Sequence, residues 1–231
     1  MRHVLTALTL CTILISTSQA QEPPARGGGG RAGAGAGARA TRPPLFFREE
    51  WKEAVGGGEK PVDATQTVSS ANLELKLYGP GGKDIQVTGT ANNESNPVHL
   101  WTGVCEQLCA AALRDKENFV DLTGLAMIRW VTKVSGFHQV HPILKLADGT
   151  WLVGDHAEGP TIDWRETEFA IADVRWRKLD IKLVVEREWV DRPDLSKVDE
   201  IGWTDLMTGG GTPASSRVDW IEVYGKPVTR Q

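Results

Sequence analysis

The chain has 231 residues and a formal net charge of −4 at pH 7, and 40% of its residues are hydrophobic. This length is within reach of a single all-β domain. The acidic balance excludes a protein that binds nucleic acid by electrostatics alone, because Lys and Arg must neutralise the phosphates.

Residues 1–20 predict a secretory signal peptide. A short basic start, Met1–His3, precedes an apolar stretch from Val4 to Ile15, and Ser18-Gln-Ala20 provides a small-x-small cleavage signal. The apolar stretch is too short to span a bilayer, and no later stretch is long and apolar enough to do so. We therefore expect cleavage after Ala20 and an exported protein, either periplasmic or extracellular.

Residues 21–44 are rich in Gly, Ala, Arg and Pro, a composition that cannot bury a core and predicts a flexible, disordered linker. Glu22 is its one acidic residue and stands against four arginines, so the linker is basic and the rest of the chain correspondingly acidic. A solvated spacer is the favoured interpretation, and contact with acidic surfaces or cell-envelope polymers is the alternative. The folded domain is expected to span residues 45–231.

Alternating apolar and polar residues predict a series of short strands. The expected strand segments are 45–51, 73–78, 84–88, 98–102, 106–113, 126–133, 137–147, 150–153, 161–171, 174–181, 183–190, 199–207 and 217–224. Composition alone would allow a helix over 106–113, but its place between strands favours a strand. Asp148-Gly149 predicts a tight hairpin turn, and Pro142 predicts an edge strand or a bulge.

With roughly ten to twelve strands and no amphipathic helix, the sequence predicts an all-β fold, a jelly-roll-like antiparallel β-sandwich. The segments 199–207 and 217–224 flank a Gly- and Ser-rich loop and are expected to be its last two strands. Strict alternation would place Val218 and Trp220 on one face of the final strand, and Ile221 and Val223 on the other.

Cys105 and Cys109 are the two cysteines that remain after removal of the signal peptide. Two nearby cysteines in an exported chain usually pair, whereas a metal site would need further ligands. We therefore predict a Cys105–Cys109 disulfide.

Several phrases of the second half resemble motifs of a known fold family. They are Asp121-Leu-Thr-Gly124 with Ile128-Arg-Trp130, Asp163-Trp164 with Phe169-Ala-Ile-Ala-Asp-Val174, and Asp194-Leu-Ser-Lys-Val198 with Ile201-Gly202 and Val218-Asp-Trp-Ile221. This set is similar to galactose-binding-like β-sandwiches, especially the complex I intermediate-associated protein family and some carbohydrate-binding modules. The chain departs from the pattern at Phe169-Ala, where Pro-Phe is expected. These motifs are structural, so they indicate fold more than ligand.

The resemblance implies a non-catalytic binding module that often carries a structural calcium ion. In this sequence it suggests that Asp219 meets Glu49 or Glu50 around Ca²⁺, for which hard oxygen ligands are suited. The alternative is that Asp219 pairs with a nearby arginine or caps a turn.

Surplus tryptophan on an exported acidic domain indicates carbohydrate binding, because an exposed indole can stack on the apolar face of a sugar. If Asp148-Gly149 makes a tight turn, one sugar-binding face is expected from the tryptophans, acids and arginine of neighbouring strands. The predicted ligand-binding residues are Trp151, Asp155, Glu158, Trp164, Arg175 and Trp176. Core packing is the alternative for each tryptophan.

Glu166 and Glu168 are the weak candidates for catalysis. Two positions apart on a strand, their carboxylates share one face, which makes a glycoside hydrolase with paired carboxylates the first alternative function. Hydrolase, zinc-protease and phosphate-loop motifs are missing from the sequence. A protein-interaction domain is the second alternative. We expect a binding module for carbohydrate or a cell-envelope polymer, with no cofactor other than calcium.

Overall fold

The computed structural model describes residues 41–209 and 216–230, which belong to one compact unit, residues 40–231. The predicted signal peptide and most of the predicted linker, residues 1–40, lie outside the described residues. No helix among the described residues is long and apolar enough to cross a membrane.

Strands make up almost all of the regular structure of the described residues, with two single-turn 3₁₀ helices, η1 and η2. The first eight strands are β1 (Leu45–Glu50), β2 (Lys60–Pro61), β3 (Leu73–Tyr78), β4 (Gln86–Thr88), β5 (His99–Trp101), β6 (Ala110–Asp115), β7 (Asn118–Asp121) and β8 (Met127–Val134). The others are β9 (His141–Leu146), β10 (Trp151–Gly154), β11 (Arg165–Ala170), β12 (Trp176–Asp180), β13 (Val185–Val190), β14 (Val198–Thr204), β15 (Ser216–Tyr224) and β16 (Lys226–Thr229). The 3₁₀ turns are η1 (Gly82–Asp84) and η2 (Ile171–Asp173).

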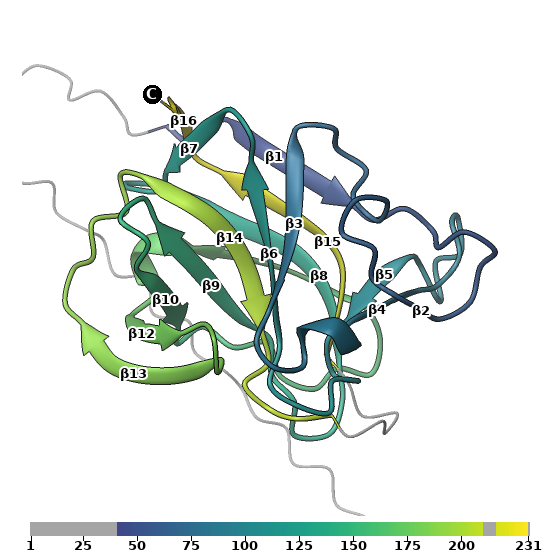
Figure 1. Ribbon diagram of the computed structural model, residues 1–231. Coiled ribbons are helices and arrows are strands. Elements are labelled where there is room, and N and C mark those ends of the chain that lie inside the picture. The colour runs from purple at the N-terminus through teal and green to yellow at the C-terminus, as the bar shows by residue number, and fades with distance from the viewer. Residues whose placement is uncertain (1–40, 210–215, 231) are drawn as a thin grey trace, which may run out of the picture. The chain divides into compact units, whose positions relative to one another are not determined.

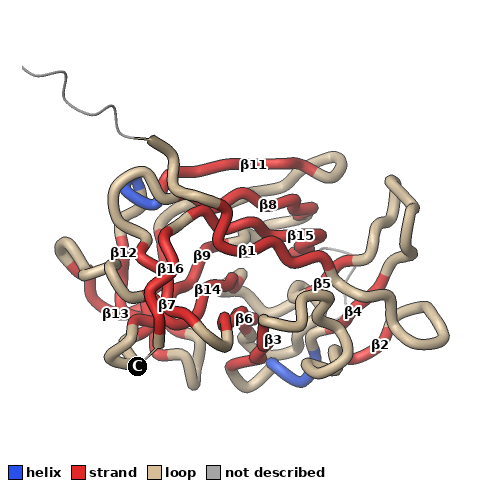
Figure 2. Tube along the Cα trace, turned by 90° about the horizontal axis from the view of Figure 1, so that it is seen from above, coloured by secondary structure: helices blue, strands red, loops and turns tan. Residues whose placement is uncertain are grey.

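The strands form two antiparallel sheets that face one another (Figures 1 and 2). The β15 sheet has the order β11-β8-β15-β5-β4-β2, and β1 also pairs with β15. The β14 sheet has the order β13-β12-β10-β9-β14-β6-β3. In addition, β7 pairs with β14, and β16 pairs with β7. The predicted all-β antiparallel sandwich is confirmed. The strand expected at 106–113 is present as β6, but it begins only at Ala110, because residues 106–109 belong to the loop that the disulfide closes. There are more strands than the ten to twelve expected, because short pairings such as β2 and β16 leave little sequence signal.

The last two strands that the sequence predicts, at 199–207 and 217–224, lie in different sheets. β14 is an interior strand of one sheet and β15 of the other, and β16 follows β15 to close the chain. Pro142 also differs from its prediction, since β9 lies between β10 and β14 and is not an edge. Its ladder with β10 begins only at Ile143, so the missing proline N–H falls at the end of that ladder.

The core lies between the sheets and is built from the inward positions of the alternating strands. Ile128 and Trp130 on β8 face Ile201 and Trp203 on β14, and all four are at most 1% exposed. Burying each such side chain stabilises the fold by roughly 1.5–3 kcal/mol. Gly202 is required on the opposite face of β14, because a Cβ there would come within 1.9 Å of the Ala111 carbonyl oxygen.

A second, smaller apolar cluster covers the outer face of the β14 sheet. Tyr78 and Trp151 pack edge to face there, with ring centroids 4.8 Å apart. Val184, from the turn between β12 and β13, is 1% exposed and packs into the same cluster. This part of the outer face is therefore filled by the chain's own side chains.

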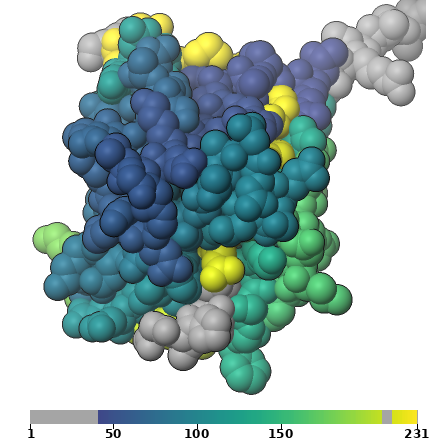
Figure 3. Space-filling model, turned by 90° about the vertical axis from the view of Figure 1, so that its right-hand side faces the viewer, coloured from purple at the N-terminus to yellow at the C-terminus, as the bar shows by residue number. Residues whose placement is uncertain are grey.

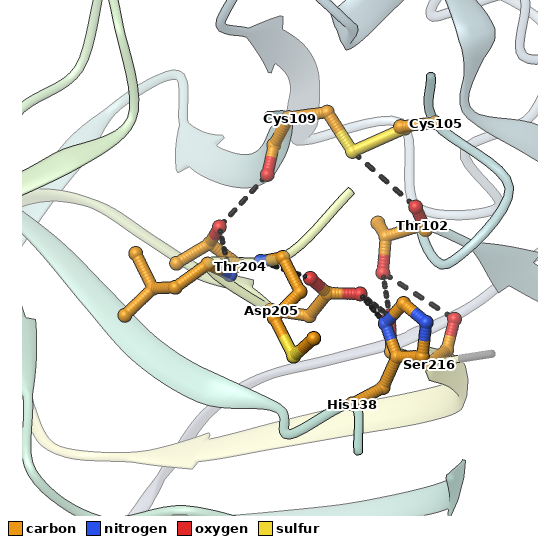
Figure 4. Close-up of a disulfide and its surroundings, with 9 residues drawn as sticks. Thr102, Cys105, Cys109, His138, Thr204, Asp205 and Ser216 are labelled. Atoms are coloured by element: carbon orange, nitrogen blue, oxygen red, sulfur yellow. Dashed lines mark hydrogen bonds and ion pairs between the residues drawn. A yellow bond between two sulfur atoms is a disulfide. The ribbon is translucent and has the colours of Figure 1, made fainter. Parts of the chain in front are cut away.

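Cys105 and Cys109 form a disulfide, which confirms the prediction. Thr204, the last residue of β14, donates its hydroxyl hydrogen to the Cys109 carbonyl oxygen at 2.8 Å (Figure 4). The disulfide loop is thereby tied to the end of the β14 sheet.

A buried polar network continues from the disulfide loop toward the other sheet (Figure 4). His138 Nδ1 lies 2.8 Å from Asp205 Oδ2, and the Ser216 hydroxyl donates to the same oxygen at 2.6 Å. Thr102 Oγ1 lies 2.8 Å from Ser216 Oγ. Because Asp205 follows β14 and Ser216 begins β15, this network joins the two sheets at one end of the sandwich.

Replacing both cysteines with serine should lower the free energy of unfolding by a little under ~3 kcal/mol, because the closed loop is short. Urea denaturation of the wild type and of the double variant measures the difference. Reduction of the disulfide in the wild type should lower the free energy of unfolding by the same amount. Equal stability of the oxidised and reduced proteins would show that the disulfide does not constrain the fold.

Candidate functional site

The candidate site lies on the outer face of the β15 sheet, where β15 carries a bulge. Val218 pairs with Thr132 of β8 and Trp220 pairs with Val131, so Asp219 has no partner in that ladder. On its other side, β15 pairs with β5 up to Val218 and with β1 from Trp220 onward. A bulge inserts an unpaired residue and redirects its side chain, and here it presents Asp219 where two neighbouring strands change over.

Asp219 lies at one wall of a cavity of about 450 Å³, which we call the Trp164 cleft. Its lining residues are Asn92, Asn93, Glu94, Pro97, Trp164 and Asp219. They come from three parts of the chain: the loop between β4 and β5, the residue before β11, and the bulge of β15. Residues of the N-terminal half of the described chain, blue to teal, cover much of the side on which β2, β4 and β5 lie (Figure 3).

The loop over the cleft is held by its own hydrogen bonds. Asn93 Oδ1 accepts the backbone N–H of Ser95 at 3.2 Å and that of Asn96 at 3.3 Å, an arrangement common for asparagine in turns. The indole N–H of Trp164 donates to the Ser95 carbonyl oxygen at 3.3 Å. The loop and the indole therefore hold one another in place without a ligand.

Trp164 is half-buried and stands between two polar neighbours. Its ring centroid is 4.9 Å from that of His99, and Lys133 Nζ lies 5.8 Å from its centroid. Burial lowers the pKa of His99 to about 4, so this imidazole is neutral at physiological pH. Lys133 is paired with Asp163 at 3.3 Å. The indole is thus fixed in orientation while remaining partly accessible.

The Asp219 carboxylate has no hydrogen bond or ion pair in the described part of the chain. Burial raises its pKa to about 6, and repulsion from Glu50 contributes in the same direction. Arg48 opposes this weakly from a distance, since it is hydrogen-bonded to Glu50 at 2.7 Å. A half-buried carboxylate without a partner is costly to ionise, and perturbed pKa values of this kind concentrate at functional sites.

Four buried polar atoms on β4, β5 and β15 lack a hydrogen-bond partner within the described chain. Gln86 Oε1, His99 Nε2, Trp101 Nε1 and Arg217 Nε are buried and have no hydrogen-bond partner among the described residues. Gln86, Trp101 and Arg217 occupy matching positions on β4, β5 and β15, so they form one row across the sheet. Each unpaired buried group costs about 1–3 kcal/mol, and such groups often mark sites of ordered water or a polar ligand.

The structure does not bring the six predicted ligand-binding residues together. Trp151 and Trp176 are 8% and 2% exposed, so both are largely packed against neighbouring strands, although Trp176 and Arg175 also line a second cavity beside β13. Glu158 is also buried, where it accepts hydrogen bonds from the Trp130 indole at 3.3 Å and the Thr167 hydroxyl at 3.2 Å. The structure therefore gives these three residues structural roles in place of the predicted ligand-binding ones.

Trp164 lies apart from Trp151, because the two belong to different sheets, and it is the one predicted tryptophan that lines the cleft. Asp155 and Arg175 pair with each other at 2.8 Å instead of facing a ligand. The sequence reasoning missed Asn92, Asn93 and Glu94 as site residues. Their segment was recognisable as a polar loop, but nothing in it indicated that it would fold over β15.

A larger cavity of about 610 Å³ lies beside β13 and is a weaker candidate. Its exposed aromatic residue is Trp189, whose ring centroid lies 4.8 Å from the guanidinium of Arg175 and 4.1 Å from that of Arg177. Arg175 is bound to Asp155, and Arg177 lies 3.8 Å from Glu186. Unlike Asp219, these charged groups already have partners, so the Trp164 cleft remains the stronger candidate.

Glu166 and Glu168 share the outer face of β11, as the spacing predicted. Glu166 forms an ion pair with Arg129, and Glu168 pairs with Arg42 at 2.9 Å. Their side chains are 50% and 43% exposed, and neither lines the Trp164 cleft. The geometry therefore offers no enclosed acid–base pair at these positions.

Two of the three carboxylates predicted to hold calcium have other partners in the structure. Both oxygens of Glu49 accept backbone N–H groups, from Ser69 at 2.5 Å and Ser70 at 3.1 Å, and Glu50 is bound to Arg48. The described residues contain no group of three or more His, Cys, Asp or Glu side chains that could hold a metal ion. Calcium binding stays a prediction, which a comparison of melting temperatures with calcium and after chelation would test.

Comparisons with known proteins find only distant structural similarity to carbohydrate-binding modules. No family model and no curated protein matches the chain. A family 11 carbohydrate-binding module of the cellulosomal cellulase Lic26A-Cel5E of Clostridium thermocellum is 17% identical, with 74% of this chain and 96% of that chain covered and a TM-score of 0.44.

Two further structures are similar to a lesser degree. The family 11 module from Clostridium thermocellum in complex with a beta-1,3-1,4-mixed-linked tetrasaccharide is 17% identical, with 73% and 96% of the two chains covered and a TM-score of 0.42. An exo-beta-agarase is 12% identical, with 70% and 24% covered and a TM-score of 0.37. At such identities and TM-scores the likeness carries no argument about the ligand of this chain. Membership of the complex I intermediate-associated protein family stays a prediction.

The substitution Asp219→Asn should make the protein more stable at neutral pH. The pKa of Asp219 in the folded protein, about 6, exceeds the ordinary aspartate value of 3.8, so the folded state holds the proton more tightly than the unfolded chain. The free energy of unfolding therefore falls as pH rises from about 4 to about 6, and the variant lacks this loss. At pH 7 it should gain about 1–2 kcal/mol in urea denaturation.

The control for this prediction is Glu117→Gln, which removes one negative charge from an exposed turn of the other sheet. Its free energy of unfolding should follow that of the wild type across the same pH range. An Asp219→Asn variant with the pH dependence of the wild type would show that Asp219 is ionised in the folded protein without cost.

Proposed function

We propose that this chain is an exported, non-catalytic carbohydrate-binding module whose ligand binds in the Trp164 cleft. The observation that carries the proposal is the placement of an accessible indole and an unpaired half-buried carboxylate, Trp164 and Asp219, in one cavity. Ligand sites combine apolar or aromatic walls with a few convergent polar groups, and this cavity has both.

The chemistry of the cleft suits a sugar ring. One face of a pyranose presents C–H groups that pack on an indole, and its hydroxyl groups need hydrogen-bond partners. Asp219 and Glu94 supply acceptors, and the side-chain amides of Asn92 and Asn93 supply donors and acceptors. Because Trp164 is fixed by Ser95 and His99, little side-chain freedom is lost on binding.

Export is supported by the signal-peptide pattern of residues 1–20 and by the Cys105–Cys109 disulfide, since disulfides persist mainly in oxidising compartments. Catalysis by Glu166 and Glu168 gains no support, because each carboxylate is neutralised by an arginine on an open surface. A binding role therefore accounts for the site better than hydrolysis does.

The substitution Trp164→Ala should weaken glycan binding by about tenfold to a hundredfold while leaving the protein folded. Losing one stacking indole costs on the order of 1–3 kcal/mol, by analogy with base stacking, and Trp164 is only half-buried. A glycan array identifies the ligand, and isothermal titration of that ligand into the variant and the wild type gives the affinities.

Trp189→Ala is the matched control, because Trp189 is 47% exposed on β13 and lies outside the cleft. It should retain wild-type affinity, and thermal melting should show both variants folded. If Trp189→Ala abolishes binding and Trp164→Ala does not, the site is misplaced. The proposed function is wrong if no glycan on the array retains the protein. It is also wrong if incubation of the protein with a glycan releases sugar products and the Glu166→Gln variant releases none.

A further inference from the structure

We infer that the Trp164 cleft selects glycans with a protonated amine on the stacked sugar, whose ammonium is held by the Asp219 carboxylate. The inference rests on the proposed function and adds to it the class of sugar. The ligand would be an amino sugar without its acetyl group, as part of an oligosaccharide or polysaccharide.

The negative charge of the cleft is not neutralised by the protein. Asp219 and Glu94 both line the cavity, and neither has an ion pair among the described residues. Glu50, at the end of β1, adds repulsion at Asp219. A sugar stacked on Trp164 would therefore meet an excess of negative charge at the opposite wall.

The cations near the cleft are already engaged. On β1, Arg48 is bound to Glu50 and, at 2.5 Å, to Glu222. On β8, Lys133 is paired with Asp163, and the neighbouring His99 is uncharged at neutral pH because burial lowers its pKa. Arg48 and Lys133 are therefore both bound to other carboxylates and not to Asp219.

Arg217 is the remaining cation on the same strand, and it is directed elsewhere. Its guanidinium lies 4.7 Å from the ring centroid of Trp101, and it does not line the cavity. It forms no ion pair with Asp219 in the described chain. We therefore assign the positive group that compensates Asp219 to the ligand.

The charge balance separates three classes of sugar. An ammonium group forms a charge-assisted hydrogen bond with Asp219, which is roughly twice as strong as a hydrogen bond between neutral groups. It also gains a cation–π attraction from the indole of Trp164. A neutral sugar makes only ordinary hydrogen bonds, and a uronic acid brings a second negative charge against Asp219 and Glu94.

The test compares three oligosaccharides of equal length and the same β-1,4 linkage, built from glucosamine, N-acetylglucosamine or glucose. They differ only at the second carbon, which carries an ammonium, an acetamide or a hydroxyl group. Isothermal titration near pH 6.5 should give about tenfold or tighter binding of the glucosamine oligomer relative to the other two.

The substitution Asp219→Asn keeps the shape of the side chain and removes its charge. It should abolish the preference, reducing affinity for the glucosamine oligomer by about tenfold and affinity for the glucose oligomer much less. Glu117→Gln, the exposed control on the other sheet, should keep the preference. Wild-type affinity for the glucosamine oligomer should fall on both sides of a maximum, as Asp219 takes up a proton at lower pH and the amine loses one at higher pH.

The outcomes separate this inference from the proposed function. Equal binding of the three oligomers, all weakened by Trp164→Ala, overturns the preference and leaves the carbohydrate-binding site in place. A preference that survives in Asp219→Asn also overturns it, because bulk electrostatic attraction then accounts for the effect. Binding that is indifferent to Trp164→Ala overturns both proposals, and failure of all three oligomers to bind overturns the preference for amino sugars.

Discussion

The pairing of β15 is the constraint on which the rest of the structure depends. This strand contacts β8 along almost its whole length on one side, and on the other side it pairs first with β5 and then with β1. The change from β5 to β1 occurs at Asp219, and the ladder with β8 on the opposite edge carries its bulge at the same residue. This bulge turns one carboxylate away from the regular pattern.

The two outer faces of the sandwich differ in what remains available to a ligand. On the β14 sheet, Val184 from the β12–β13 turn packs into the cluster around Tyr78 and Trp151, so the chain's own side chains fill that part of the face. On the β15 sheet, a loop folds over the strands without filling the space beneath it, and Trp164 closes one side. The position of a site therefore follows from which loops cover which sheet.

Charge pairing on the β15 sheet gives the Trp164 cleft its character. Below the cleft, Glu222 is 6% exposed and is bound by both Arg48 and Arg129, with the Arg48 guanidinium stacked 4.2 Å from the Trp220 ring centroid. The charged side chains of that surface therefore pair with one another. Asp219 lies one residue away from this arrangement and takes no part in it, so its charge remains for an external partner.

The sequence by itself determined the class of fold, because alternation between apolar and polar residues is a local property that the pleat of a strand imposes directly. It also determined the disulfide, since only three residues lie between its cysteines. Only the tertiary structure decided which tryptophans are exposed: packing buries Trp151, and a loop about seventy residues upstream frames Trp164. The bulge at Asp219 was equally invisible, because it depends on how β15 pairs with β8, and pairing between distant segments leaves no local signal.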